Sequence, residues 1–132
     1  MEKVCLDTDI LIDLLRGKQD VVERVREFEK SYELTTTSIT LFELYYGAFK
    51  VGREKNVMAV RELARRIEVL EFTEKDAELA GKMSAELDRS GEGLDFGDIL
   101  IAAISINRGA KLYTGNLRHF KRLKKFGLRV EG

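Results

Sequence analysis

The feature that most constrains this chain is the alternation of short apolar runs with stretches of helical periodicity. The runs with strand character lie at residues 3–7, 34–37, 67–72, 111–114 and 128–130. Helical patterns lie between them, at residues 8–16, 21–32, 39–50, 56–66, 73–89, 98–108 and 117–125. Short strands that alternate with helices form parallel βα units. The sequence therefore predicts an α/β fold whose helices cover both faces of a small parallel sheet.

Several helix ends carry residues that commonly cap helices. Ser38 precedes a strongly apolar helix and is expected to cap it. Thr73 and Asp76 have the spacing of a capping box, with Asp in place of the usual Glu. Gly109 follows the most apolar helix and suits the left-handed position that ends many helices.

Length and composition indicate a single domain over residues 1–132. A chain of this length with 44% hydrophobic residues can form one core, and it contains no proline and no Gly/Ser-rich linker. No uncharged stretch, including residues 99–107, reaches the roughly 20 apolar residues of a membrane-spanning helix. The lone cysteine, Cys5, excludes an internal disulfide and a cysteine-based zinc site, and no signal peptide is recognisable. We therefore expect a cytoplasmic protein with no membrane segment.

Charge is unevenly distributed, although the net charge is zero. From residue 107 to the end there are eight Lys/Arg residues and one acid, Glu131. A basic end indicates contact with nucleic acid or with an acidic partner. An exposed, solvated helix explains the same pattern equally well. The bases of the predicted last helix are Arg118, Lys121, Arg122, Lys124 and Lys125.

Asp7 and Glu43 are acidic residues at positions that favour a functional role. Asp7 ends the first strand, so its carboxylate is expected at the carboxyl edge of the sheet, where ligands of such folds bind. A helix follows at once, so an N-cap role explains Asp7 as well. Glu43 lies on or beside the apolar face of its helix, where an unpaired carboxylate is costly. It is expected either to hold a metal ion or to pair with an arginine.

Further polar groups are expected at the same edge of the sheet. Asp98 opens the most apolar helix, where it is also a candidate N-cap. Asp95, three residues earlier, either lies close to Asp98 or is a solvated acid of the loop, and the second interpretation is favoured. Thr114 and Asn116 follow a predicted strand. Clustered carboxylates repel one another unless a cation lies between them. Oxygen ligands and scarce histidine favour Mg²⁺ or Mn²⁺ over zinc, and such ions support phosphodiester hydrolysis.

Four blocks of sequence carry a resemblance to a known family. They are VCLDTDILIDLL (4–15), TSITLFELYYG (37–47), DILIAA (98–103) and TGNLRHF (114–120). With these blocks in this order, the chain resembles the PIN-domain ribonucleases, and within them the VapC-type toxins of VapBC toxin–antitoxin pairs. The resemblance implies an α/β/α sandwich with a small central parallel sheet.

The resemblance also implies the site residues. By position, Asp7, Glu43 and Asp98 match the three acids that hold the catalytic Mg²⁺ or Mn²⁺. Asn116 stands where many relatives have a fourth acid, and its one neutral carbonyl oxygen implies weaker binding of a second metal. Thr114 is implied to orient the site through its hydroxyl.

The implied reaction is hydrolysis of an RNA phosphodiester that leaves 3′-hydroxyl and 5′-phosphate ends. In it Asp7 and Asp98 hold the metal, and Glu43 completes its shell or orients the attacking water. Arg118 and the basic helix are expected to steer the RNA backbone, whereas His119 is not expected to act as a base. The family also implies a homodimer and a cognate VapB-type antitoxin that lies across the acidic cleft.

Two other functions remain open from the sequence. Asp7 and Asp9 resemble the Asp-x-Asp motif of haloacid-dehalogenase-like phosphatases, in which they would be nucleophile and general acid. The chain is short for that fold, and Asp9→Asn would abolish a phosphatase but only perturb a PIN nuclease. The other is a non-catalytic PIN-like module that binds RNA or a partner protein, for which Asn116 is the support.

Overall fold

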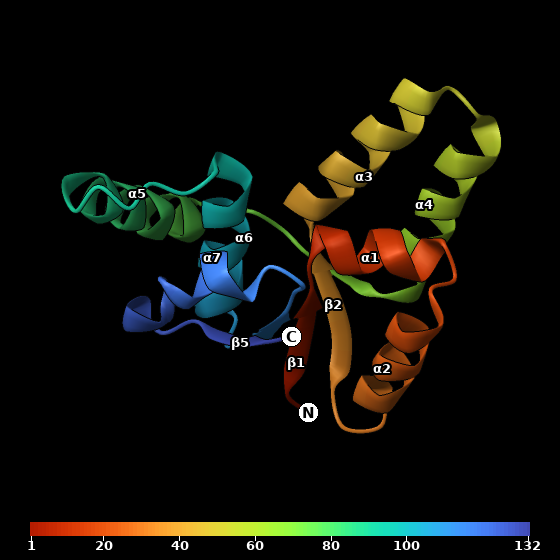
Figure 1. Ribbon diagram of the computed structural model, residues 1–132, viewed down its shortest axis with the longest axis horizontal. Helices are drawn as coiled ribbons and strands as arrows, with labels where there is room; N and C mark the ends of the chain where they lie inside the picture. Colours follow the sequence, from red (N-terminus) through yellow and green to blue (C-terminus); the bar gives the residue numbers. More distant parts are fainter.

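The computed structural model describes residues 1–132 and contains a five-stranded sheet flanked by helices (Figure 1). The strands are β1 (Lys3–Leu6), β2 (Glu33–Thr37), β3 (Glu68–Leu70), β4 (Lys111–Tyr113) and β5 (Arg129–Glu131). The helices are α1 (Thr8–Leu15), α2 (Gln19–Glu29), α3 (Ser38–Val51), α4 (Glu54–Arg66), α5 (Glu74–Arg89), α6 (Phe96–Asn107) and α7 (Leu117–Lys121), and a 3₁₀ helix, η1, covers Lys124–Phe126. None of these helices has the length and apolar character needed to cross a membrane.

The sheet is entirely parallel, and its strand order is β3-β2-β1-β4-β5. The chain builds from β1 outward to β3 and then returns to place β4 and β5 on the other side of β1. The order therefore reverses between β1 and β4, and ligands of open α/β sheets bind at such switch points. Because all strands run the same way, the residues that follow β1 and β4 meet at one edge of the sheet.

Alternate residues of the central strand pack on opposite faces of the sheet. Val4 and Leu6 join an apolar cluster with α1, α2, α3 and α4, whereas Cys5 joins a second cluster with α5, α6 and α7. Figure 1 shows the same division of the helices into two groups. Val4, Cys5 and Leu6 are fully buried, on both faces of the sheet, as a sheet between two helical layers requires. The predicted α/β/α sandwich is confirmed.

The start of α3 differs in detail from the prediction. Thr37, not Ser38, caps this helix, because its hydroxyl accepts the backbone N–H of Thr40 at 3.0 Å. Ser38 is instead the first helical residue, and its Oγ accepts the backbone N–H of Phe72 at 3.2 Å. The cap position is one residue earlier because β2 runs through Thr37 directly into the helix.

Two later boundaries also differ. Helix α6 begins at Phe96 with Asp95 in the N-cap position, so Asp98 lies in the first turn and is not the N-cap. The predicted basic helix over 117–125 is divided into α7 and η1, because the regular helix ends at Lys121. The earlier start of α6 matters for function, since it leaves the Asp98 carboxylate free of a capping role.

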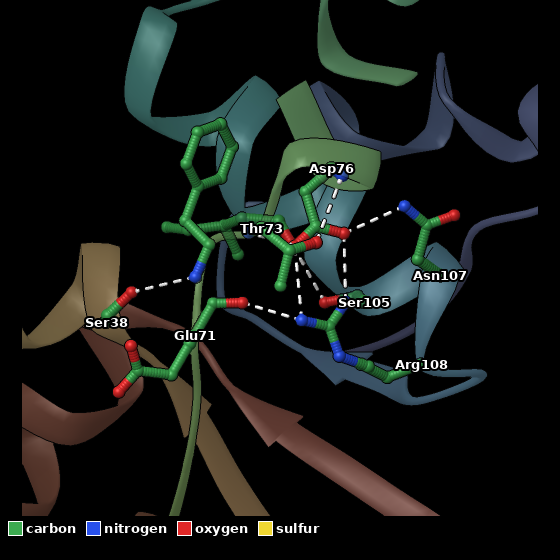
Figure 2. A network of polar contacts seen from close by, with 9 residues as sticks. Ser38, Glu71, Thr73, Asp76, Ser105, Asn107 and Arg108 are labelled. Carbon is green, nitrogen blue, oxygen red and sulfur yellow. Dashed lines mark hydrogen bonds and ion pairs between the residues drawn. The ribbon is translucent and has the colours of Figure 1, made fainter. Parts of the chain in front are cut away.

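A buried polar network joins the beginning of α5 to the end of α6 (Figure 2). Thr73 and Asp76 form the predicted capping box, in which the Thr73 N–H donates to Asp76 Oδ2 at 2.8 Å. The fully buried Asp76 carboxylate also accepts from the Asn107 amide at 2.8 Å and from the Arg108 guanidinium at 2.9 Å. Arg108 donates in addition to the Glu71 carbonyl at 2.6 Å. The network therefore fixes α5 against the C-terminal end of α6.

The C-terminal excess of positive charge is partly neutralised in the structure. Arg108 pairs with Asp76, and Lys111 with Glu131 at 3.1 Å. Arg129 pairs with an acid at the other end of the chain, Glu2. The positive surface is therefore smaller than the sequence count implies, and its exposed bases are Arg118, Lys121, Lys124 and Lys125.

Candidate active site

An open cleft of about 460 Å³ lies at the switch point of the sheet, beyond the carboxyl ends of β1 and β4. Five of the nine residues that line it are acidic and none is basic. The structure thus brings together the predicted residues Asp7, Glu43, Asp98 and Asn116 from four separate segments. The complete lining is Asp7, Thr8, Asp9, Ile12, Glu43, Asp95, Asp98, Gly115 and Asn116.

Asp7 is both the N-cap of α1 and a wall of the cleft. Its Oδ1 accepts the backbone N–H of Thr8 at 2.8 Å, and its Oδ2 accepts the hydroxyl of Thr114 at 2.7 Å. The residue is only 5% exposed. Burial first, and then the nearby carboxylates of Asp9 and Asp98, raise the pKa of Asp7 to about 6, although both hydrogen bonds lower it. The side chain is well oriented, but its negative charge is poorly stabilised by the protein alone.

We expect Asp7→Asn to stabilise the metal-free protein at neutral pH. The folded pKa of about 6 lies above the unfolded value of about 3.9, so folding favours the protonated form. The wild type is therefore destabilised as pH rises between these two values, whereas the amide keeps the cap and carries no charge. The free energy of urea unfolding should be about 2 kcal/mol higher in the variant at neutral pH, with no difference near about pH 4. A variant less stable than the wild type at neutral pH would contradict this account.

Glu43 is half-buried on α3 and forms no salt bridge, so the arginine pairing considered from the sequence is wrong. Its Oε1 accepts the hydroxyl of Thr8 at 2.5 Å. A Cβ at position 97 would lie 3.0 Å from its Oε2, so Gly97 allows the first turn of α6 to approach this carboxylate closely. Glu43 is thereby held at the cleft by a neutral donor, and its charge is not neutralised by a base.

Asp98 faces Glu43 from the first turn of α6. Its pKa is raised, first by burial and also by the charges of Asp95 and Glu43, although His119 lowers it. The His119 Nδ1 lies 3.6 Å from Asp98 Oδ2 and 3.1 Å from the side-chain nitrogen of Asn116. His119 is therefore at the edge of the site, which the sequence did not predict, because the contact depends on the fold of α7 against α6.

Two further residues of the site were not predicted as such. Thr8 donates to Glu43, and no local signal in the sequence indicates this contact. Asp9 accepts the backbone N–H of Gly115 at 3.0 Å and so fixes the loop after β4 against α1. A Cβ at position 115 would lie 2.5 Å from Asp9 Oδ2, so a larger residue in this loop would displace the Asp9 carboxylate.

The two residues predicted to support the site differ in their placement. Thr114 is fully buried below the cleft, and its hydroxyl donates to Asp7 and accepts the backbone N–H of Asn116 at 3.0 Å. Arg118 is exposed on α7 and does not line the cleft. Its predicted role in steering RNA stays a prediction.

The acids of the cleft face a common space but stand apart from one another. No three His, Cys, Asp or Glu side chains approach closely enough to form a ready-made metal cage. Burial first, and then the neighbouring like charges, raise the pKa of Asp7 and of Asp98, and a cation bound among them would lower both pKa values. The fold and the cleft define an α/β/α domain with an acidic site, which favours the binding of a cation, at the switch point of its sheet.

The family assignment follows from comparison with known proteins. Residues 4–126 match the family described as PIN domain, and the chain belongs to this family. A haloacid-dehalogenase-like phosphatase is thereby excluded. Ribonuclease VapC2 of Haemophilus influenzae is 35% identical over 133 residues, with 99% of this chain and 98% of the relative covered. The tRNA(fMet)-specific endonuclease VapC of Salmonella typhimurium is 36% identical over 132 residues, with the same coverage.

Solved structures show the same fold. The crystal structure of DNA-bound VapBC from Salmonella typhimurium matches with a TM-score of 0.88 and 35% identity, over 99% of this chain and 98% of that one. The structure of VapBC2 from Rickettsia felis, bound to a DNA fragment from its promoter, matches with a TM-score of 0.88 and 28% identity, over 97% and 96% of the two chains. The similarity extends over the whole sheet and the helices that carry the acidic cleft.

Proposed function

We propose that this chain is a VapC-type endoribonuclease, the toxin of a type II toxin–antitoxin pair, and that it hydrolyses phosphodiester bonds of RNA. The observation that carries the proposal is the acidic cleft, to which Asp7, Glu43 and Asp98 each bring a carboxylate from a separate segment. Relatives named as ribonucleases match the chain over nearly their whole length, which supports the same class of reaction.

Mg²⁺ or Mn²⁺ is the cofactor that these residues fit. The lining of the cleft offers carboxylate and amide oxygens and contains no lysine, arginine or histidine, and the nearest basic side chain, His119, lies at its edge, 3.6 Å from Asp98. Asp7, Glu43 and Asp98 would hold the ion, with Asn116 as a weaker ligand. When bound, the ion supplies positive charge for the phosphodiester and lowers the pKa of a water molecule.

The residues of the chain have separate tasks in this proposal. Asp7 is oriented by Thr8 and Thr114, so its carboxylate needs little reorganisation on binding a cation. Glu43, with one oxygen fixed by the Thr8 hydroxyl, is placed to orient the attacking water with the other. Attack of this water on the phosphodiester leaves 3′-hydroxyl and 5′-phosphate ends.

The partners of the protein follow from the same assignment. The solved relatives are VapBC complexes, which supports a VapB-type antitoxin as the partner of this chain. An acidic cleft suits an inhibitor that inserts a basic side chain. We also propose a homodimer, and the cytoplasm as the place of action.

Thr114→Val is expected to slow RNA cleavage by about ten- to hundredfold, the usual cost of losing a group that orients a metal ligand. The change keeps the shape of the side chain but removes the donor to Asp7 and the acceptor of the Asn116 N–H. Thr114→Ser retains both hydrogen bonds and should cleave at nearly the wild-type rate. Steady-state rates at saturating Mn²⁺ check this, and equal rates for Val and Ser would contradict it.

The proposed function is tested with antitoxin-free protein and a mixture of single-stranded and structured RNAs. We expect cleavage with Mn²⁺ or Mg²⁺ and none with EDTA, because the acids alone repel the substrate and supply no positive charge. End analysis should show 5′-phosphates. RNA binding without cleavage, together with absence of Mn²⁺ binding in calorimetry, would overturn the proposal in favour of a non-catalytic module.

A further inference from the structure

Two exposed phenylalanines are immediate neighbours, in the sequence, of acids that line the cleft. Phe42 precedes Glu43 on α3 and is 67% exposed. Phe96 lies between Asp95 and Asp98 in the first turn of α6 and is 78% exposed. The packing of the core explains neither ring, because both apolar clusters of the domain form without them.

The charge of the cleft creates a problem for RNA binding that these rings solve. RNA is a polyanion, and the cleft presents five acids with no base among its lining residues. A lysine or arginine at the rim would pair with the carboxylates and compete with the metal ion. An aromatic ring binds a nucleobase through stacking, which needs no counter-charge and works with every base.

We propose that Phe42 and Phe96 are base-stacking platforms on two sides of the acidic cleft, which hold unpaired nucleotides that flank the scissile phosphate. The inference rests on the proposed function and deepens it, because it assigns the side chains that hold unpaired nucleotides at the site. Bases inside a duplex are already stacked, so only unpaired segments can present free faces to the two rings.

A surface for a second copy of the chain is the competing explanation, and Phe96 argues against it. Its neighbours in the sequence, Asp95, Gly97 and Asp98, add no apolar side chain, and it stacks on no other ring. Stable protein interfaces bury roughly 800 Å² of surface on each partner. The area of one isolated ring is far smaller. A single flat ring is, in contrast, all that one base requires.

Phe42 lies at one end of a longer row of aromatic side chains on α3. The rings of Phe42 and Tyr46 are stacked at 6.3 Å with an interplanar angle of 24°. Lys50 Nζ lies 5.8 Å above the Tyr46 ring, so a positive charge follows the aromatic surface as it leaves the cleft. Phe49, two turns from Phe42 and 62% exposed, gives a matched control on the same helix.

The test combines binding and cleavage of one short single-stranded RNA that carries 2-aminopurine. Binding is read in Ca²⁺ from quenching of the 2-aminopurine fluorescence, and cleavage is read in Mn²⁺. Phe96→Leu and Phe42→Leu keep apolar bulk but lose the flat ring, so each should raise the RNA Kd and the KM by about tenfold with little change in kcat. Phe96→Tyr and Phe49→Leu should behave as the wild type.

Several outcomes would overturn the inference. The inference is wrong if Phe42→Leu and Phe96→Leu bind and cleave RNA as the wild type does. It is also wrong if Phe49→Leu loses as much RNA affinity as these two variants. A shift of the sedimentation coefficient of the free protein in Phe96→Leu or Phe42→Leu would assign the rings to an interface between copies. A wild type that binds with ring-dependent quenching but does not cleave would overturn the proposed function and leave the platforms supported. A wild type that neither binds nor cleaves would overturn both.

Discussion

Asp98→Asn is expected to lower the rate of RNA cleavage by about a hundred- to ten-thousandfold and to leave the fold intact. A metal ion contributes several kcal/mol to stabilising the developing charge, and each 1.4 kcal/mol or so is a factor of ten in rate. The amide keeps the shape of the side chain but offers no charge to the ion. Asp98 suits this experiment better than Asp7, because it has no cap hydrogen bond and its only protein partner is His119.

The control for this substitution is Asp20→Asn. Asp20 occupies the first turn of α2, as Asp98 does that of α6, so both changes remove the same favourable interaction with a helix N-terminus. Asp20 does not line the cleft, and its variant should cleave as the wild type. Cleavage by Asp98→Asn at the wild-type rate would remove Asp98 from the site, or would show that a contaminant cuts the RNA.

Asp76→Ala is expected to lower the free energy of unfolding by about 3 kcal/mol without touching the cleft. Breaking a buried, hydrogen-bonded ion pair costs about 3 to 5 kcal/mol. The lower end applies because the Arg108 side chain is 26% exposed and can be rehydrated once its partner is lost. The change also removes half of the capping box and leaves the Asn107 amide without its acceptor (Figure 2). Urea unfolding followed by circular dichroism measures the difference.

The pH dependence of stability is a second test of the contribution of Asp76. Burial raises the pKa of Asp76, but hydrogen bonds from Arg108, Asn107 and Thr73 outweigh it, so the folded pKa lies below the ordinary value. The stabilisation is therefore fully present above an unfolded pKa of about 3.9 and is lost as pH falls below it. The difference between wild type and Asp76→Ala should shrink in strong acid.

Asp88→Ala is the matched control for this variant. Asp88 lies on the same helix, α5, and is exposed, so its loss should change the free energy of unfolding by less than about 0.5 kcal/mol. A loss in Asp76→Ala no larger than in Asp88→Ala would show that the network contributes little to stability.

Much of the fold could be predicted from sequence because its signals are local. Helix periodicity, the short apolar strands and the Thr73–Asp76 capping box depend on spacings of two to four residues, which can be read directly along the chain. The carboxyl-edge position of Asp7 also follows from the strand that it ends, given that the strands are parallel. The boundaries were less secure: Ser38 and Asp98 are both good capping residues, and each helix begins before the expected position.

The contacts inside the site could not be predicted in the same way. Thr8 reaches Glu43, and His119 reaches Asp98, across separations that only the packing of helices onto the sheet closes. Asp76 illustrates both cases in one residue. Its bond to Thr73 is fixed by a three-residue spacing, whereas its pairing with Arg108 requires α5 and α6 to lie side by side.

The parallel α/β fold, its helix signals and, through four ordered blocks, the residues of the candidate site can all be read along the chain. Only the packing of the segments shows that the acids line one cleft with no base in its lining, that Glu43 has no arginine partner, and that Phe42 and Phe96 are exposed. The two kinds of information differ because the underlying interactions differ in range. Periodicity and caps act within a turn or a strand, but the charge and exposure of a cleft depend on every segment that meets there.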